Sequence, residues 1–188
     1  TASVGRARAR IGLLGNPGDL YGGKVLAATI DAFETVATVT RTVFYAPASF
    51  QPDVADLQRL AVARVAPSKG AIALGLKTNV PSQSGLSGSS AILLATLRAL
   101  DAHLDLGLEP LDMAQIAWDI ERKDLGVVAG PQDRIIQALG GLQCMDFSGP
   151  DEIGNHEALD PDLLPPLLVA WPKEPGTPSG DVHRALWE

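Results

Sequence analysis

Residues 81–91 constrain the fold of this chain more than any other segment. They read Pro-Ser-Gln-Ser-Gly-Leu-Ser-Gly-Ser-Ser-Ala, between an apolar stretch at residues 71–77, predicted as a strand, and an apolar run at residues 89–103, predicted as a helix. Glycines let the backbone approach a ligand closely, and a helix N-terminus presents N–H groups and a positive dipole end. Serine hydroxyls add hydrogen-bond donors, and one of them can bind magnesium. The segment therefore predicts a triphosphate-binding loop, with a serine-rich linker that caps a helix as the alternative.

The rest of the sequence predicts a mixture of strands and helices. Strands are expected where β-branched and apolar residues alternate or run together, at residues 7–14, 24–30, 35–43, 142–147 and 167–171. Helices are expected where apolar residues recur at helical spacing, at residues 54–65 behind Asp53 as N-cap, at 111–123, and at 131–139 with Pro131 in the first turn. Turn-forming residues predict loops at residues 15–23, 46–52 and 148–166.

Length and composition limit the architecture and the classes of function. We expect one domain over residues 1–171, then a proline- and glycine-rich linker and the start of a second domain at residues 172–188. No apolar run is long enough to span a bilayer, and the basic N-terminal residues lack the apolar centre of a signal peptide. The single cysteine, Cys144, excludes an internal disulfide framework and is typical of a reducing cytoplasm. A net charge of −7 argues against a protein that coats nucleic acid.

Residues 18–24 match the spacing G-x-x-x-x-G-K of a Walker phosphate loop, and a predicted strand precedes them. The match fails after Lys24, because Val25 stands where a Ser or Thr would hold magnesium. A strand rather than a helix is predicted to follow, so no helix N-terminus would face the phosphates. We therefore interpret this segment as a glycine-rich turn between two strands.

A carboxylate and a cation stand side by side at a turn that opens a predicted helix. Residues 126–134 end in Gly-Pro-Gln-Asp-Arg, so Asp133 and Arg134 lie where the helix dipole favours an anion. Upstream, Glu121 lies near the end of the preceding predicted helix. An aspartate in this position can accept a proton or orient a substrate hydroxyl. The alternative is a structural aspartate that pairs with a surface arginine.

Together these segments resemble the family of galactokinase, homoserine kinase, mevalonate kinase and phosphomevalonate kinase, the GHMP kinases. Residues 10–23 resemble the first motif of the family: Asp19 matches an aspartate that binds sugar hydroxyls, whereas Asn16 and Pro17 replace the usual Glu-His. Residues 81–91 resemble its phosphate-loop motif P-x-x-x-G-L-x-S-S-A, with Gly88 as one extra residue.

Within the family, the chain is most similar to kinases of sugars. The similarity is strongest to the glucuronokinases of plants, which phosphorylate the anomeric hydroxyl of glucuronate, and it runs over nearly the whole chain. The likeness to sugar kinases rests on Gly-Pro-Gln-Asp-Arg at residues 130–134 followed by Gly-Gly-Leu at 140–142. The likeness to the glucuronokinases rests on Gly-Asn-Pro at residues 15–17, Thr-Asn-Val-Pro at 78–81, Gly-Leu-Ser-Gly-Ser-Ser-Ala at 85–91, Met-Asp-Phe-Ser at 145–148 and Leu-Leu-Pro-Pro at 163–166.

The resemblance implies a fold and a set of cofactors. The fold is an α+β domain like domain 2 of ribosomal protein S5, with a left-handed βαβ crossover that departs from the usual hand. Family members also carry a C-terminal domain with a third, glycine-rich motif, and we expect that domain to be largely absent from these 188 residues. The implied cofactors are ATP and Mg²⁺, and the implied partner is a small sugar, with no nucleic acid and no membrane.

The resemblance also implies a role for each matching residue. Asp133 would orient or deprotonate the attacking hydroxyl, Asp19 would bind sugar hydroxyls, and Ser90 and Glu121 would hold Mg²⁺. Arg10 would be a catalytic residue and Arg134 a substrate-binding residue. Either could stabilise the transferring phosphate or a substrate carboxylate. The nucleotide phosphates would be bound by Pro81, Ser84, Gly85, Leu86, Ser87, Gly88, Ser89, Ser90 and Ala91.

The implied function is transfer of the γ-phosphoryl group of ATP to a sugar hydroxyl, with the anomeric hydroxyl of a uronic acid as the expected acceptor. The alternatives are mevalonate or another sugar, such as galactose, fucose or a heptose phosphate, and, from a different class, a non-catalytic nucleotide-binding module. The joint presence of Ser90, Glu121 and Asp133 favours an enzyme, because a module that only binds needs no proton acceptor.

Overall fold

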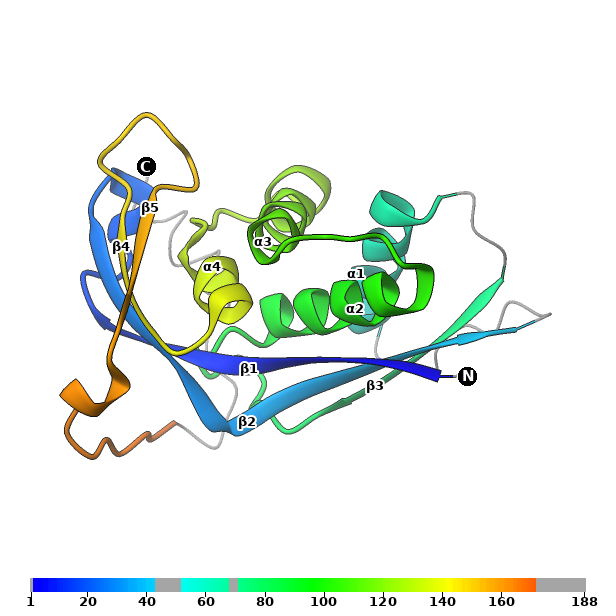
Figure 1. Cartoon of the computed structure of the whole chain (residues 1–188), viewed down its shortest axis with the longest axis horizontal. Helices are drawn as coiled ribbons and strands as arrows, with labels where there is room; N and C mark the ends of the chain where they lie inside the picture. Colours follow the sequence, from blue (N-terminus) through cyan, green and yellow to red (C-terminus); the bar gives the residue numbers. More distant parts are fainter. Residues whose placement is uncertain (1, 43–51, 68–70, 172–188) are drawn as a thin grey trace.

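The computed structural model describes residues 2–42, 52–67 and 71–171. These residues form a five-stranded sheet with the helices gathered on one face, so that the molecule has two layers (Figure 1). All strand pairs are antiparallel. The expected α+β fold is therefore confirmed.

The long second strand organises the sheet. Along one edge it pairs with the first strand, and along the other edge its C-terminal half pairs with the third strand and its N-terminal half with the fourth. The third and fourth strands therefore run in the same direction, and helices connect them, as a βαβ crossover requires; its left hand stays a prediction. The strands are β1 (Ala2–Leu14), β2 (Lys24–Arg41), β3 (Ile72–Thr78), β4 (Leu142–Asp146) and β5 (Asn155–Leu159).

The helical layer is built around one apolar helix, α2 (Gly88–Leu104). Leu93, Leu94, Leu97 and Leu100 have no exposed surface, and burial of each leucine contributes roughly 1.5–3 kcal/mol. The buried residues run from Ser90 to Leu100, so the packing of the helix begins in its first turn. Around it pack α1 (Pro52–Val65), α3 (Pro110–Asp119), the single π-helical turn η2 (Ile120–Asp124) and α4 (Gln132–Leu139).

The predicted helices at residues 54–65, 89–103, 111–123 and 131–139 are confirmed within a few residues, and residues predicted as strands at 7–14, 24–30, 71–77 and 142–147 lie in strands to within one residue, but the strand predicted at 167–171 is wrong. Residues 24–30 and 35–41 belong to one strand, β2, which ends at Arg41 and whose register shifts opposite Arg8 and Ala9, while residue 43 lies outside the described residues. The first strand begins at Ala2 rather than at residue 7. Residues 167–171 form no strand, and β5 occupies part of the predicted loop at 148–166.

Residues 167–171 illustrate why apolar composition alone misleads. Leu168 is 95% exposed, whereas Val169 packs on a small apolar cluster and Trp171 meets the edge of the Phe33 ring at 5.1 Å between centroids. Side-chain packing, rather than backbone hydrogen bonds to a neighbouring strand, holds this segment against the rest of the domain. The predicted linker at 172–188 and most of the predicted loop at 46–52 lie outside the described residues, as does the side chain of Asp53.

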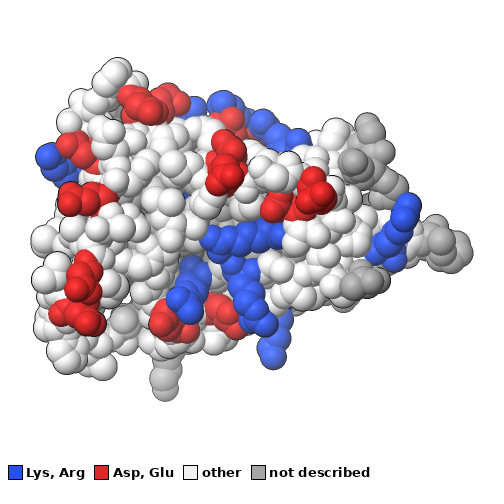
Figure 2. All heavy atoms as spheres, viewed as in Figure 1, with Lys and Arg blue, Asp and Glu red and all other residues white. Residues whose placement is uncertain are grey.

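The surface carries interspersed charges. Figure 2 shows acidic side chains scattered over one face, with basic side chains gathered near its centre. Exposed ion pairs join the strands, among them Arg6 with Glu34 and Arg8 with Asp31, both at 2.9 Å. Among the described residues, no helix has the length and apolarity that a bilayer crossing needs.

Candidate active site

The segment predicted to bind phosphate forms a tight turn at the start of α2. Gln83, Gly85 and Ser87 have positive φ angles of 51°, 76° and 60°. Non-glycine residues are held in this region only where the surrounding structure fixes them, which is common at ligand clamps. Ser87 is the N-cap residue, yet it makes no side-chain cap hydrogen bond, so it leaves the first-turn N–H groups to an anion. The Ser84 hydroxyl closes the turn by donating to the Pro81 carbonyl at 2.8 Å.

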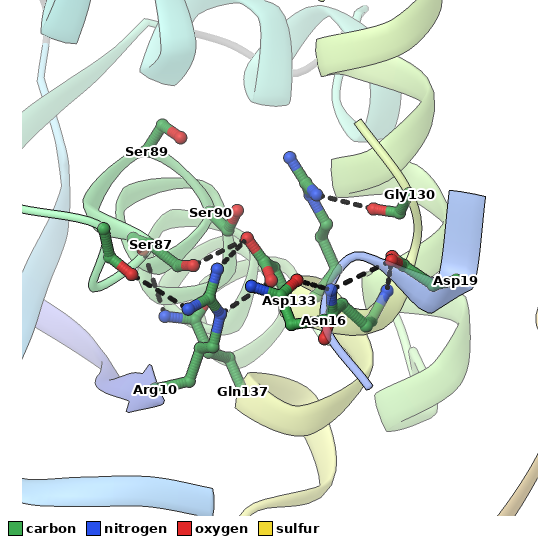
Figure 3. Close-up of polar contacts among 12 residues, drawn as sticks. Arg10, Asn16, Asp19, Ser87, Ser89, Ser90, Gly130, Asp133 and Gln137 are labelled. Carbon is green, nitrogen blue, oxygen red and sulfur yellow. Dashed lines mark hydrogen bonds and ion pairs between the residues drawn. The ribbon is translucent and has the colours of Figure 1, made fainter. Parts of the chain in front are cut away.

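Arg10 and Asp133 form a bidentate ion pair beside this turn (Figure 3). Arg10, on β1, donates from Nε to Oδ1 at 2.6 Å and from Nη2 to Oδ2 at 2.8 Å, and its Nη1 donates to the Gly85 carbonyl at 2.9 Å. The Ser87 hydroxyl donates to Asp133 Oδ2 at 2.6 Å. The arginine that pairs with Asp133 is therefore buried in the sheet and not on the surface, and the pair ties β1, the turn and α4 together.

Asp133 is ionised at any physiological pH. Burial disfavours the charged carboxylate, but the charge and hydrogen bonds of Arg10, the charge of Arg134 and the hydroxyl of Ser87 outweigh it and lower its pKa to about 2. Asp133 accepts three hydrogen bonds from Arg10 and Ser87. A carboxylate offers about four acceptor positions, so about one remains for an incoming hydroxyl. The side chain is 18% exposed, which leaves a path to that position.

Glu121 forms a second cluster at the same helix N-terminus. It lies in η2, a π-helical turn of the kind that recurs at functional sites, and it is 3% exposed. The Ser89 hydroxyl donates to its Oε1 at 2.7 Å and the Ser90 hydroxyl to its Oε2 at 3.3 Å. Arg134 forms an ion pair with the same Oε2 and donates to the Gly130 carbonyl at 2.7 Å. The structure thus brings together the residues predicted to hold the metal.

The donors around Glu121 fit a magnesium ion. Mg²⁺ prefers oxygen ligands and is held through one or two carboxylates, with phosphate oxygens and water completing the octahedron. Glu121 and Ser90 offer one carboxylate and one hydroxyl at the start of α2. Arg134 shares that carboxylate, so a metal ion competes with its guanidinium for Oε2.

Asp19 faces the opposite side of the turn that opens α4. Its Oδ2 accepts the Gln132 backbone N–H at 3.1 Å, and its Oδ1 accepts the Gln132 side chain at 2.9 Å. Burial, and then the nearby charge of Asp133, raise the pKa of Asp19, partly offset by the Gln132 N–H and the charge of Arg134. A Cβ on Gly130 would lie 2.0 Å from Asp19 Oδ2, so only glycine lets this carboxylate approach the turn.

Two glutamines of the site were not predicted from the sequence. Gln132 links Asp19 to Asn16, whose side-chain oxygen accepts a short hydrogen bond from the same amide. Gln137, one helical turn after Asp133, donates to the carbonyls of Arg8 at 2.9 Å and Ser87 at 3.1 Å, which fixes the turn before α2 against β1. The only sequence signal was the four-residue spacing from Asp133 to Gln137 on one helix face.

Residues 18–24 have the turn structure that we inferred instead of a Walker loop. Gly18–Tyr21 forms a 3-10 turn (η1), Gly22 has a φ of 69°, and the Gly23 N–H donates to the Gly18 carbonyl at 2.7 Å. β2 begins directly afterwards at Lys24. The segment positions Asp19 and has no helix N-terminus behind it.

A cavity of about 550 Å³ opens next to Asp19. The loop at residues 126–131 forms one wall, and Trp118 and Arg122 from the end of the α3–η2 helix form another. Glu152, from the loop after β4, lines its mouth. Asp19 is hydrogen-bonded to Gln132, the residue before Asp133, and Pro131 also lines the cavity, so the cavity adjoins the start of α4.

Sequence comparisons agree with this arrangement. Residues 54–141 match the family model described as the GHMP kinases N terminal domain. In an alignment 220 positions long, the chain is 34% identical to Glucuronokinase 1 of Arabidopsis thaliana. The alignment covers 96% of this chain and 60% of that protein. It is also 41% identical, over 70 residues, to a D-glycero-alpha-D-manno-heptose 7-phosphate kinase of Campylobacter jejuni, covering 37% of this chain and 21% of that protein.

Solved structures show the same architecture. A D-glycero-D-manno-heptose 1-phosphate kinase from Bacteroides thetaiotaomicron matches 78% of this chain and 56% of its own, with a TM-score of 0.67 and 27% identity. The chain thus spans about 60% of the length of the glucuronokinases it matches, and the matched part contains the phosphate-loop segment and both carboxylate clusters. By family match, sequence identity and fold, the chain belongs to the GHMP kinases and carries their N-terminal domain.

Proposed function

We propose that the protein transfers the γ-phosphoryl group of ATP to a sugar hydroxyl, with the anomeric hydroxyl of a uronic acid as the preferred acceptor. The observation that carries this proposal is the convergence of two carboxylates on the start of α2. Asp133 reaches it through Arg10 and Ser87, and Glu121 reaches it through Ser89 and Ser90. An anion site, a metal-ligand pair and an acceptor for a hydroxyl proton thus lie around one helical turn.

Phosphoryl transfer needs positioning and charge neutralisation more than covalent chemistry. The turn at residues 83–87 and the first N–H groups of α2 would bind the phosphates of ATP. Mg²⁺, held by Ser90 and Glu121, would neutralise charge on the phosphates when bound. The acceptor oxygen then bonds to the γ-phosphorus as the bond to the β-phosphate oxygen breaks, and ADP leaves.

The electrostatics of Asp133 favour an orienting role over that of a strong base. A general base works best with a pKa near the working pH, whereas the pKa of Asp133 is about 2. Its remaining acceptor position can align the acceptor hydroxyl and take its proton late, once the forming P–O bond has made that proton acidic. Arg10 keeps the carboxylate fixed and anionic.

The proposed acceptor rests on two observations. Asp19 lines the cavity, is hydrogen-bonded to the residue before Asp133, and can accept hydrogen bonds from sugar hydroxyls. The likeness to the glucuronokinases covers 96% of this chain, whereas the heptose 7-phosphate kinase covers 37% of it.

An acceptor screen tests the proposal. The complete gene product containing this chain is incubated with Mg·ATP and, separately, glucuronate, galacturonate, glucose, galactose, fucose, a heptose phosphate and mevalonate, while ADP formation is followed. We expect ADP formation that depends on a sugar and is fastest with a uronic acid. Equal ADP formation with and without every acceptor would overturn the proposal.

A further inference from the structure

The cavity beside Asp19 contains a cation that the reaction itself does not use. Arg122 lines the cavity, and its guanidinium carbon lies 4.1 Å from the centroid of the Trp118 ring. Trp118 is 5% exposed, and its indole N–H donates to the Ala129 carbonyl at 2.7 Å. The aromatic platform is therefore rigid, and a guanidinium stacked on it loses little further freedom on binding a ligand.

The present partner of Arg122 is weakly held. Its two terminal nitrogens donate to the carboxylate of Glu152 at 3.2 and 3.4 Å, and the Glu152 side chain is 64% exposed. An exposed pair of this kind contributes at most about 1 kcal/mol. A planar carboxylate on a ligand matches the guanidinium fork as well as Glu152 does, so it can replace Glu152 at little cost.

Two side chains of different charge line the cavity. Asp19 in the lining is an acceptor for hydroxyl groups, and Arg122 in the same lining is a donor for an anion. A ligand that contacts both side chains carries hydroxyls and a carboxylate.

We propose that Arg122 is the specificity-determining residue that selects acceptors bearing a carboxylate, by exchanging its ion pair with Glu152 for one with the acceptor. This inference rests on the proposed sugar kinase function, and it assigns the discrimination between uronic acids and neutral sugars to one side chain. Glu152 then acts as a competitor that holds Arg122 in place until the acceptor arrives.

The test compares kcat/KM for glucuronate and for glucose in the complete gene product. Arg122→Gln should lower the value for glucuronate by about 10-fold to 100-fold, the range of one lost charged hydrogen-bond pair, and leave the value for glucose nearly unchanged. Arg122→Lys keeps the positive charge but loses the two-nitrogen geometry of the guanidinium, so its kcat/KM for glucuronate should lie between the values of the wild type and Arg122→Gln. Glu152→Gln should raise the value for glucuronate a few-fold, because it removes the competitor.

Arg64→Gln is the matched control. Arg64 also forms a surface ion pair, with Asp124 at 2.6 Å, but it does not line the cavity, so neither acceptor should be affected. Calorimetric titration of each variant with glucuronate, in the presence of a non-hydrolysable ATP analogue, gives the same ranking without turnover.

The possible failures are distinguishable. An equal loss of kcat/KM with both acceptors in Arg122→Gln would make the residue structural and would overturn the inference. Turnover of neutral sugars only, in the wild type, would overturn the inference and leave the sugar kinase function intact. Turnover of no sugar at all would overturn both.

Discussion

Replacement of Asp133 by asparagine separates a catalytic carboxylate from a structural one. Asparagine keeps the shape of the side chain but brings an NH₂ group against one of the two Arg10 nitrogens, where the carboxylate accepted hydrogen bonds at 2.6 and 2.8 Å. The bidentate pair is therefore lost, and the buried Arg10 is left without its charge partner. Both activity and stability should change, and the two effects must be measured separately.

The size of the stability effect follows from the pKa of Asp133. A pKa lowered from 3.8 to about 2 means that folding stabilises the ionised carboxylate relative to the protonated one. At 1.36 kcal/mol per pKa unit, this stabilisation is about 2 kcal/mol. We therefore expect Asp133→Asn to lower the free energy of unfolding by about 2 kcal/mol at neutral pH. A variant of this kind stays largely folded in a domain of ordinary stability.

The activity effect should be larger. If Asp133 aligns the acceptor hydroxyl and accepts its proton, kcat should fall by about 100-fold or more, with little change in KM for ATP. The assay is steady-state ADP formation with glucuronate, corrected for the folded fraction from urea unfolding of the same sample. Near-wild-type kcat in the folded variant would refute the catalytic role, whatever its stability.

Asp146→Asn is the matched control for this experiment. The pKa of Asp146 is also lowered to about 2, by hydrogen bonds from Ser148 and the pairing with Lys24, but it lies in β4 and outside the site. Its replacement should leave kcat unchanged. A loss of activity in this control would mean that any loss of a low-pKa aspartate impairs the enzyme.

Three further predictions follow from the same contacts. The stability contribution of Asp133 should be complete above about pH 4 and should disappear as the pH falls toward 2, because its folded pKa lies below the unfolded value; urea unfolding of wild type and Asp133→Asn at about pH 6 and pH 2.5 measures it. Ser90→Ala should reduce the magnesium-dependent thermal shift caused by ATP, since one metal ligand beside Glu121 is removed, and an unchanged shift would contradict the metal assignment. Gly130→Ala should displace Asp19, with which a Cβ would collide, and raise KM for the sugar by about 10-fold while KM for ATP stays constant; an unchanged KM for the sugar would argue against Asp19 as a sugar ligand.

The sequence predicted the phosphate-loop segment because its physical signals agree. A glycine- and serine-rich stretch stands between two apolar segments of different period, and both neighbours folded as expected, into β3 and α2. The same agreement is absent from β5, whose sequence Asn-His-Glu-Ala-Leu has little apolar alternation because it is an exposed strand at the edge of the sheet. Conversely, residues 167–171 are apolar without forming a ladder among the described residues.

The contacts of the site were harder to predict than its members. Arg10 and Asp133 are 123 positions apart, and only the packing of α4 against β1 brings them together. Gln132 and Gln137 carry no charge and match no motif, so their role in linking Asp19 and the turn before α2 becomes visible only in three dimensions. Arg122 lies four positions after Trp118 in the helix predicted at 111–123, a spacing that brings the two side chains together, but the cavity that both line is visible only in three dimensions.

Transfer of a phosphoryl group to a sugar hydroxyl is the reaction that we propose for this protein. Phosphorus NMR of the complete gene product with Mg·ATP and glucuronate tests it most directly, because it observes donor and product together. We expect ADP and a new sugar phosphate to appear in equal amounts, with phosphorus coupled to the anomeric proton. Formation of ADP with inorganic phosphate alone, or no consumption of ATP, would contradict it.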